Sequence, residues 1–589
     1  MKYKNNYTLD IEVAPDRTIF KNKKLDSEVE AFVYSVAIFD LSRDPIAERL
    51  DGFRRFLGFS DLFDTFIRED KKQRATYWFL VHNLGYDGIF IIYWALSMGL
   101  TEAGDEIKRN EFRVLQKQST IYKIAINYRN VTFIFEDNYC KNPAKLQKLG
   151  ELVGYQFTHK GKEDIDYLKP RSTFDVTPEE LDYIIDDVAS LALIHKKLNT
   201  NARLTIGSTA FNDFLTNRSP FKRNAEDDYK LIRWRYNQAF PNALNVKLFG
   251  DYYLGGMCDL IDAEPDHVYK TPIHCYDINS MYPFAMLGLM PMGEAMEEAY
   301  DPHKDYTRGT FRYFLKIRFH IETIKVNYYV AKHSRDMFDP HTDVIIPELL
   351  PIIKSCYTFR KFEVISVYKF ASISNLFGPY VSTHYETKKT ATDPINRTKA
   401  KLLLNSLYGK FAQRTDTYRI HYELIDGLLN TTTEKEIIET KAYHPIAITI
   451  TQKSRVLLFK TIHQLHEAGY KVYYTDTDSI KTDANPETFQ KITGNLDQDR
   501  IGAWKYEGVA TESVFIAPKK YLMMNGDDVI AVGMSGINKM DHDYRMADTT
   551  VKSEINIKNY RRGLTLTVGR KKRVKGGILI LPTIYTIEN

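Results

Sequence analysis

Acidic side chains at regular spacings are the first feature of the chain that could do chemistry. Residues 7–13 alternate between apolar and polar types as in a β-strand, which puts Asp10 and Glu12 on one face. Two acids on one strand face are costly unless they meet water or a cation, so a solvated edge strand is the alternative interpretation. Farther along, the apolar run 78–81 leads into a predicted turn that carries Asp87.

A helix predicted from about residue 177 adds a fourth acid. Thr177, a proline and then Glu180 form the pattern of a capping box, and Tyr183 and Asp187 lie one turn apart on the helix that follows. Carboxylates suit Mg²⁺ or Mn²⁺, and a pair of such ions can hydrolyse a phosphodiester by activating a water molecule. We therefore expect a metal site made of Asp10, Glu12, Asp87 and Asp187, with Tyr183 orienting the water.

A second set of acids lies in the C-terminal two thirds. Asp277 ends an apolar run, and Asp476 and Asp478 lie in the acidic turn of a hairpin predicted over 471–480. Taken alone, such a turn is more typical of a protein surface.

Between these acids lies a helix with an unusual face. Asp393 and the proline after it predict the start of this helix, and Arg397, Lys401, Asn405 and Tyr408 follow at spacings that place them in one row. A cationic, amide and aromatic row is poor core material, but it suits a triphosphate, a sugar and a base. A merely solvated helix face would not require the asparagine and tyrosine in line with the basic residues.

The composition sets wider limits. With 589 residues, 43% of them hydrophobic, the chain is expected to form several domains. A net charge of +5 does not by itself indicate nucleic-acid binding, so any binding surface must be local. The four cysteines fit no zinc or disulfide pattern, and neither a signal peptide nor an apolar run of ~18 residues occurs. We expect a soluble, cytoplasmic protein that does not bind a membrane.

Taken in order, the two sets of acids resemble the motifs of family B DNA polymerases. The first set resembles their three exonuclease motifs, and the segments around Asp277, Lys401 and Asp476 resemble polymerase motifs A, B and C. Motif A precedes motif B by 124 residues (Asp277 to Lys401), and motif B precedes motif C by 75 (Lys401 to Asp476). These gaps resemble the protein-primed branch, found in small linear-genome bacteriophages and linear plasmids, which carries an insertion in each gap.

This resemblance implies an α/β and α+β multidomain fold, with a ribonuclease-H-like exonuclease domain before a right-hand polymerase domain. The expected units are the exonuclease over 1–207, palm over 208–287 and 447–547, fingers over 377–411 and thumb over 548–589. The insertion 288–376 is expected to contact a terminal protein and DNA. The insertion 412–446 is expected to be an arm for strand displacement and processivity, because strand-like runs over 417–425 and 436–440 flank a turn and a polar stretch. A tolerated surface loop is the alternative for this arm.

The resemblance also implies roles for individual residues. Asp277, Ile278 and Asp478 would bind two metal ions at the polymerase site, with Asp476 close by, and Lys160 would face the scissile phosphate of the exonuclease site. The incoming nucleotide would meet Tyr282, which excludes a ribose, together with Lys389, Lys401, Asn405 and Tyr408. DNA would meet His82, Asn83, Leu84, Tyr253, Gly255, Gly256, Lys519 and Tyr521. The basic stretch 561–575 is expected to be a thumb hairpin on duplex backbone. Residues 136–139 depart from the branch, which has a Ser/Thr-Leu primer-binding motif there.

The sequence therefore predicts a protein-primed, template-directed DNA polymerase with a 3′→5′ exonuclease and two Mg²⁺ or Mn²⁺ ions at each active site. Its expected partners are template-primer DNA, deoxynucleotides and a terminal protein, and the chain is expected to be a monomer. Two alternatives remain: a ribonuclease-H-type nuclease with an inactive accessory domain, and an inactive scaffold for a replication partner.

Overall fold

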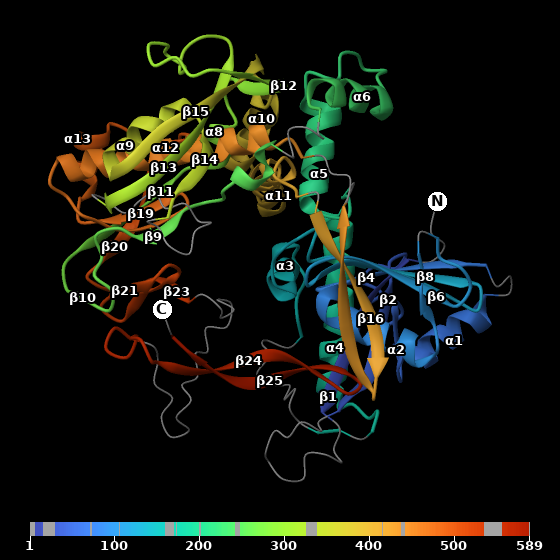
Figure 1. Ribbon diagram of the computed structural model, residues 1–589. Helices are drawn as coiled ribbons and strands as arrows, with labels where there is room; N and C mark the ends of the chain where they lie inside the picture. The colour runs from blue at the N-terminus through green and yellow to red at the C-terminus, as the bar shows by residue number, and fades with distance from the viewer. Residues whose placement is uncertain are drawn as a thin grey trace.

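The elements of the computed structural model are arranged as a ring in Figure 1. The structure describes residues 6–15, 30–70, 74–104, 106–158, 170–171, 173–199, 202–241, 248–324, 339–414, 416–437, 442–534 and 556–587. Lys160 and the residues expected at the junction of palm and thumb, 535–555, lie outside this description. No helix among the described residues is long and apolar enough to cross a membrane.

An eight-stranded sheet with helices on both faces forms the N-terminal unit. The strand order is β3-β2-β1-β4-β8-β7-β6-β5, and β1 pairs parallel with β4, which pairs parallel with β8. The strands are β1 (Asn6–Pro15), β2 (Ala31–Asp40), β3 (Phe53–Phe56), β4 (Thr76–Val81), β5 (Thr101–Glu102), β6 (Glu111–Lys117), β7 (Thr120–Tyr128) and β8 (Val131–Asp137). The helices are α1 (Phe59–Glu69) and α2 (Leu84–Ser97), which share a core on one face, and α3 (Leu146–Leu152) and α4 (Pro178–Leu198), which share another.

Local sequence patterns account for much of this unit, with two differences. The capping box at the start of α4 is present, since the Thr177 side chain and Glu180 bond reciprocally to each other's backbone. β1 lies between β2 and β4, so it is not the solvated edge strand that remained as an alternative. The predicted turn carrying Asp87 is instead the first turn of α2, which begins at Leu84 after Asn83 in the left-handed conformation (φ 70°). Asp87 is buried in the first turn of α2, where a negative charge interacts favourably with the helix dipole.

A second unit is built on two sheets. A five-stranded sheet has the order β20-β11-β19-β18-β9, and a four-stranded sheet has the order β10-β21-β22-β23. The strands are β9 (Cys258–Leu260), β10 (Val268–Tyr269), β11 (Ile273–Ile278), β18 (Val472–Asp476), β19 (Ser479–Thr482), β20 (Trp504–Ala510), β21 (Glu512–Ala517), β22 (Lys520–Asn525) and β23 (Asp528–Met534). The helices beside them are α8 (Met281–Ala285), α12 (His444–Glu467) and α13 (Pro486–Thr493).

The chain between β11 and α12 forms three smaller parts. A four-stranded sheet contains β12 (Met290–Glu298), β13 (Arg312–Ile324), β14 (His341–Ile345) and β15 (Tyr357–Ile373), with α9 (Leu350–Cys356) beside it. Two helices follow, α10 (Gly378–Thr390) and α11 (Pro394–Ser406), and then the hairpin β16 (Asp416–Ile425) and β17 (Leu428–Ile437). The second strand of this hairpin starts earlier than predicted, directly after the Asp426–Gly427 turn, because the polar residues 430–433 pair with β16.

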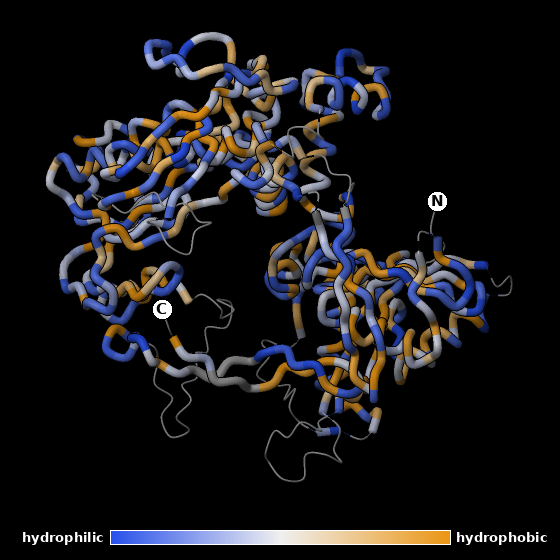
Figure 2. Tube along the Cα trace, in the orientation of Figure 1, coloured by the Kyte–Doolittle hydropathy of each residue, from blue (hydrophilic) through white to orange (hydrophobic). Residues whose placement is uncertain are grey.

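Connecting helices and a C-terminal hairpin complete the ring. The N-terminal unit continues into α5 (Ile206–Asp213), the π-helix η3 (Phe214–Arg218) and α6 (Tyr229–Ala239). The hairpin β24 (Thr565–Val574) and β25 (Gly577–Thr586) runs back from the second unit to the N-terminal unit (Figure 1). Figure 2 shows hydrophobic residues along the part of this hairpin that lies next to the N-terminal unit.

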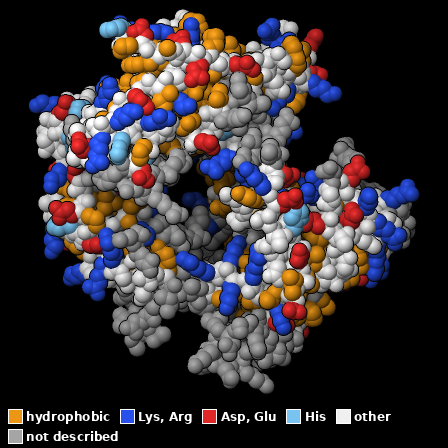
Figure 3. Space-filling view, in the orientation of Figure 1, with side chains coloured by type: hydrophobic (Ala, Val, Ile, Leu, Met, Phe, Trp, Pro, Cys, Tyr) orange, Lys and Arg blue, Asp and Glu red, His pale blue; other side chains and the backbone are white. Residues whose placement is uncertain are grey.

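The C-terminal hairpin closes the ring by packing into the core of the N-terminal unit. Ile578 and Leu579 are buried together with Phe90 of α2 and with Tyr422 and Leu429 of the β16–β17 hairpin. At its tip the Ala31 amide donates a hydrogen bond of 2.7 Å to the Lys575 carbonyl. Figure 3 shows a hollow at the centre of the ring, with Lys and Arg side chains beside it.

Candidate active sites

Three of the four acids in the first predicted set lie together between β1 and α4. Carboxylate oxygens of Asp10, Glu12 and Asp187 all lie within 4.8 Å of one another. Helix α4 is held against β1 because the Thr8 hydroxyl donates a hydrogen bond of 2.7 Å to the Val188 carbonyl. This contact sets Asp187 beside the strand residues Asp10 and Glu12.

The neighbour of Asp187 fixes the rotation of α4. Asp186 is 3% exposed, and its Oδ1 accepts hydrogen bonds of 2.8 Å from both Arg49 Nη2 and the Tyr155 hydroxyl. Its Oδ2 accepts one of 2.7 Å from the Thr158 amide. Sequence reasoning missed this role, because two consecutive aspartates give no signal of which one faces the strand.

The electrostatics of this cluster fit a divalent cation. Burial and the neighbouring charges of Asp10 and Asp187 raise the pKa of Glu12 well above its usual range. Burial also raises the pKa of Asp87 to about 8, although the Lys571 ammonium opposes this shift. Acids this close and this buried do not all ionise without a cation, so the donor set suits metal ions that prefer oxygen ligands.

Lys571 lies on β24 of the C-terminal hairpin, which was predicted from the sequence to contact only duplex DNA. Its ammonium lies 5.3 Å from the centroid of the Tyr86 ring, and burial lowers its pKa. A cavity of about 530 Å³ lies where the N-terminal unit meets both hairpins, and its lining includes Asn83, Tyr139, Lys571 and Arg573. The hairpin thus contributes to this site as well as closing the ring.

The predicted primer-contact residues occupy unlike environments. Asn83 is exposed, whereas Leu84 is fully buried. His82 Nε2 lies 3.0 Å from the Ala144 carbonyl, so it must carry the hydrogen, and His82 Nδ1 then accepts from the Asn138 amide at 3.0 Å. Burial lowers the pKa of His82 to about 4, so the ring is neutral. Asn138, from the segment that departs from the family pattern, therefore orients His82.

Two further residues of this site were predicted. Tyr183 is half-buried on α4, one turn before Asp187. Lys160 lies outside the described residues.

The acids of the second set meet on the five-stranded sheet. Asp277 on β11 is paired with Ser479 of β19, and the Ile278 amide donates a hydrogen bond of 2.7 Å to the Asp478 carbonyl. Asp476 ends β18, and its two carboxylate oxygens lie 2.5 and 2.6 Å from Lys519 Nζ. The hairpin predicted over 471–480 is therefore present, and its tip lies beside Asp277.

A fourth carboxylate, which no sequence pattern singles out, takes part in the electrostatics here. Burial, Asp478 and Glu507 raise the pKa of Asp277 to about 7. Burial, Asp476 and Glu507 raise the pKa of Asp478. Lys519 pairs with Asp476, so Asp277 and Asp478 are the carboxylates left to act as oxygen ligands of Mg²⁺ or Mn²⁺.

Cations from α10 and α11 approach these acids. The row on α11 is exposed as predicted at Arg397, Lys401 and Asn405. On α10, Lys388 Nζ donates a hydrogen bond of 3.0 Å to Ser280 Oγ, and burial together with the charges of Lys401 and Arg397 lowers its pKa. Lys389, the residue predicted to contact the nucleotide, is exposed on the same helix, and its charge is among the causes that lower the pKa of Asp497. Adjacent residues on a helix point about 100° apart, and a Lys-Lys pair does not tell which one faces the acids.

Three tyrosines cover the other side of the second site. The Tyr282 and Tyr408 rings lie 4.4 Å apart, between centroids, at 48°. Burial, Tyr408 and Tyr253 raise the pKa of Tyr282, and Asp478 is among the charges that act on it. Tyr282, Tyr408 and Tyr253, which lie far apart in the chain, therefore converge next to the acids.

The remaining predicted DNA contacts surround the tip of the β18–β19 hairpin. A Cβ on Gly256 would lie 2.4 Å from Thr477 Oγ1, so only glycine fits there, and the Gly255 carbonyl accepts a hydrogen bond of 2.7 Å from Arg455 Nη2. Tyr521 is 9% exposed, beside Tyr474.

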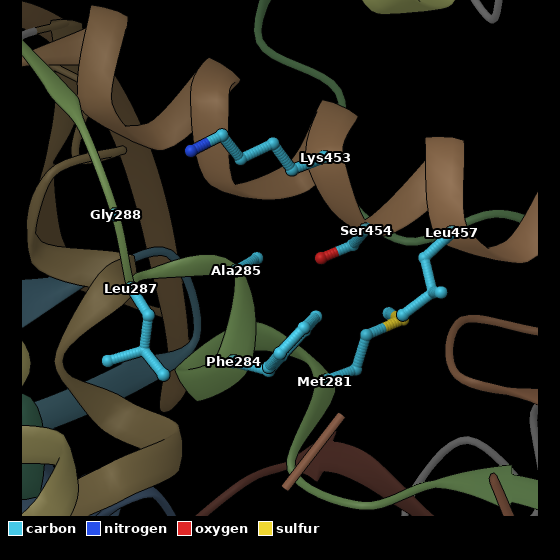
Figure 4. Close-up of a pocket in the computed structure, with 8 residues that line it drawn as sticks. All are labelled: Met281, Phe284, Ala285, Leu287, Gly288, Lys453, Ser454 and Leu457. Atoms are coloured by element: carbon cyan, nitrogen blue, oxygen red, sulfur yellow. The ribbon is translucent and has the colours of Figure 1, made fainter. Parts of the chain in front are cut away.

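An apolar cavity lies behind the second site. It measures about 360 Å³ and is lined by α8, the residues that follow it, and α12, as Figure 4 shows with Phe284, Met281 and Leu457 turned towards one another. Burial lowers the pKa of Lys453, at its edge, to about 8.

Acids from β11 and from the β18–β19 hairpin, with the helices α10 and α11 opposite them, form the arrangement of the class of right-hand DNA polymerases. A family model described as DNA polymerase type B, organellar and viral, matches residues 155–490, and the chain belongs to this family.

Individual relatives agree with this assignment. The chain is 26% identical over 567 residues to the DNA polymerases of Bacillus phage PZA and Bacillus phage phi29, which spans 89% of this chain and 93% and 92% of those proteins. A solved structure of phi29 DNA polymerase complexed with primer-template DNA has the same fold, with a TM-score of 0.80 at 22% identity, covering 99% of this chain and all of that one. The predicted family, fold class and enzymatic activity are confirmed, and an isolated nuclease is not favoured.

Proposed function

We propose that this chain is a processive, strand-displacing and protein-primed DNA polymerase that replicates a linear viral or plasmid genome and proofreads with its own 3′→5′ exonuclease. The observation that carries the proposal is the separation of two acid clusters on two sheets. The cluster around Asp277 and Asp478 is faced by Lys388, Lys401 and three tyrosines, a set that suits a nucleotide.

For polymerisation, Asp277, Asp478 and the Ile278 backbone are the proposed metal ligands, and Asp476 lies close by. Two Mg²⁺ or Mn²⁺ ions, when bound, activate the primer 3′-hydroxyl and neutralise the triphosphate. Lys401 and Asn405 contact the nucleotide from α11, and either Lys388 or Lys389 joins them from α10. Tyr408 packs on the nascent base pair, and Tyr282 occupies the space that a ribose 2′-hydroxyl would need.

For proofreading, Asp10, Glu12, Asp87 and Asp187 are the proposed ligands of a second pair of ions, and Tyr183 orients the attacking water. Asn83 is placed to hold the unpaired primer end, because it is exposed at the mouth of the cavity that Tyr139, Lys571 and Arg573 also line. His82 and Leu84, the neighbours of Asn83 in the chain, are more buried and are proposed to hold Asn83 in this position. Lys160 is proposed to face the scissile phosphate.

The ring accounts for processivity without a separate clamp. DNA in the central hollow would leave only when the contact between the C-terminal hairpin and the N-terminal unit opens. The β16–β17 hairpin is the proposed wedge for strand displacement, and the sheet β12–β15 is the proposed contact for a terminal protein. Template-primer DNA and deoxynucleotides are the substrates, the enzyme acts as a monomer, and the host cytoplasm is its proposed location.

In domain terms, the exonuclease covers 1–207, the palm 208–287 and 447–547, and the fingers 377–411. The thumb begins at 548.

A gel assay with a 5′-labelled primer tests the function. The primer should lengthen along a template with deoxynucleotides and Mg²⁺, and it should shorten when nucleotides are withheld. A primer that shortens under both conditions would instead indicate a nuclease, and an unchanged primer would indicate an inactive scaffold.

A further inference from the structure

Helix α6 carries an exposed aromatic face that neither active site uses. Its inner face packs Ile232 and Tyr236 against Phe221 and Phe240, with the Tyr236 and Phe240 rings 5.0 Å apart. Trp234 lies on the opposite side of the helix and is 59% exposed. An exposed indole ring offers a flat surface on which a nucleic-acid base can stack, and its neighbours decide whether it does so.

Trp234 stands out among the tryptophans of the chain. The other three, all among the described residues, are buried at 6% (Trp78), 8% (Trp94) and 0% (Trp504) exposure. Leu231, 40% exposed, and the exposed Lys230 lie next to Trp234 on the outer face. Lys230 is one helical turn away, so its ammonium and the indole ring belong to one surface.

The surroundings of this face are basic. Between residues 218 and 238 there are six basic and three acidic residues. Two of the acids are engaged, since Asp228 caps α6 and Asp227 pairs with Arg235 at 2.6 Å, which leaves Glu226. No ion pair to Arg223 or Lys230 occurs among the residues that the structure describes. Figure 3 shows basic, hydrophobic and acidic side chains together in the corner where Figure 1 draws α6.

An exposed aromatic ring among unpaired cations is the arrangement that binds single-stranded nucleic acid. Bases stack on the ring whatever their sequence, while cations meet the phosphates. Duplex DNA keeps its bases stacked inside and offers the ring nothing. The charge of this face therefore favours a polyanion over an apolar protein helix.

The place of α6 in the fold shows where a single strand would come from. Phe240, which ends α6, lies 5.0 Å between ring centroids from Tyr443, just beyond β17. Helix α6 thus packs, on its inner side, against the start of α12, six residues along the chain from the end of the hairpin that is proposed to part the downstream duplex. Only the source of the strand rests on the proposed function.

We propose that Lys230, Leu231 and Trp234 of α6 form a binding site for single-stranded DNA, outside both active sites, that holds either the displaced strand or the template ahead of the hairpin.

Intrinsic fluorescence tests this directly, because Trp234 is the exposed tryptophan. Oligothymidylate added to the full-length protein in EDTA, which prevents degradation, should quench the emission, and blunt duplex DNA should not. Trp234→Phe should remove most of the quench. Lys230→Ala should weaken the quench-detected binding about fivefold and reduce its salt slope by about 0.7, the value for one phosphate contact on a single strand. Lys460→Ala, an exposed lysine on α12, should change neither.

Forked DNA separates the two sources. A fork with only a displaced 5′ flap and a fork with only a template overhang are titrated separately, and quenching by the first identifies the displaced strand, whereas quenching by the second identifies the template. Quenching by neither fork nor by oligothymidylate would overturn the site, as would an equal quench by blunt duplex. If a priming protein quenched Trp234 where DNA did not, the face would be a protein contact instead. None of these failures would affect primer extension, so they leave the proposed function standing.

Discussion

The tip of the C-terminal hairpin offers a sharp test of ring closure. Gly576 has φ +82°, and a Cβ added there would lie 2.2 Å from the Ala31 carbonyl oxygen across the contact. Gly576→Ala therefore cannot keep the hairpin docked in its present position. Gly563 is a matched control, because it has a similar φ of +78°, and a Cβ added there would have no described neighbour within 4 Å.

The size of the effect follows from what the docked tip contributes. Alanine in the left-handed region costs about 1–2 kcal/mol, and both variants carry that strain. Only Gly576→Ala also loses the Ala31–Lys575 hydrogen bond, about 1 kcal/mol, and part of the burial of Ile578 and Leu579, about 1.5–3 kcal/mol for each when complete. A net loss of about 2–3 kcal/mol opens the ring roughly 30- to 150-fold more often.

Extension after a single encounter with primed DNA, with a heparin trap, measures the result. Gly576→Ala should shorten the products at least about tenfold, while addition of the first nucleotide and degradation of single strands persist. Gly563→Ala should give products close to the parent's length. If Gly576→Ala products are as long as the parent's, or if both variants shorten them equally, the tip contact does not retain DNA.

Three further expectations concern the arm, the sugar and the metals. Replacing residues 416–441 by a short glycine linker should leave gap filling intact and abolish extension through a downstream duplex, scored on gapped and nicked templates. Tyr282→Val should admit ribonucleotides, because the ring beside Tyr408 fills the space of the 2′-hydroxyl, and the ratio of kcat/KM for the two sugars measures it. Asp277 has a pKa of about 7, so protons compete with Mg²⁺ below neutrality. The Mg²⁺ concentration for half-maximal extension should therefore rise as the pH falls from 8 to 6, and a flat dependence would count against this ligand.

Local sequence rules predicted the strand, the helix and the hairpin that carry the acids. The alternation around Asp10, the capping box at Thr177 and the turn at Asp476–Asp478 each specify an element by short-range rules, and each element is present. Helical spacing also predicted the part of the row from Arg397 to Asn405, whereas Tyr408 lies beyond the end of α11 in a 3-10 turn.

Long-range contacts were not predictable in this way. Two features depend on how a helix is rotated against distant strands: which of Asp186 and Asp187 anchors α4, and how Lys388 comes to lie near Asp277. Glu507 reaches the acids only through the pairing of β20 with β11. The approach of Lys571 to Asp87 requires the ring to close between residues that lie far apart in the chain.

The central claim is that two independent acid sites work in one polypeptide, and one paired measurement tests it most directly. A 5′-labelled primer–template is incubated, with and without deoxynucleotides, with Asp478→Asn and with the double variant Asp10→Ala, Glu12→Ala. Asp478→Asn should lose extension by several orders of magnitude and keep degradation, because it removes a ligand only from the polymerase metals. The double variant should keep extension and lose degradation. Loss of both activities in either protein, at unchanged thermal stability, would contradict the two-site account.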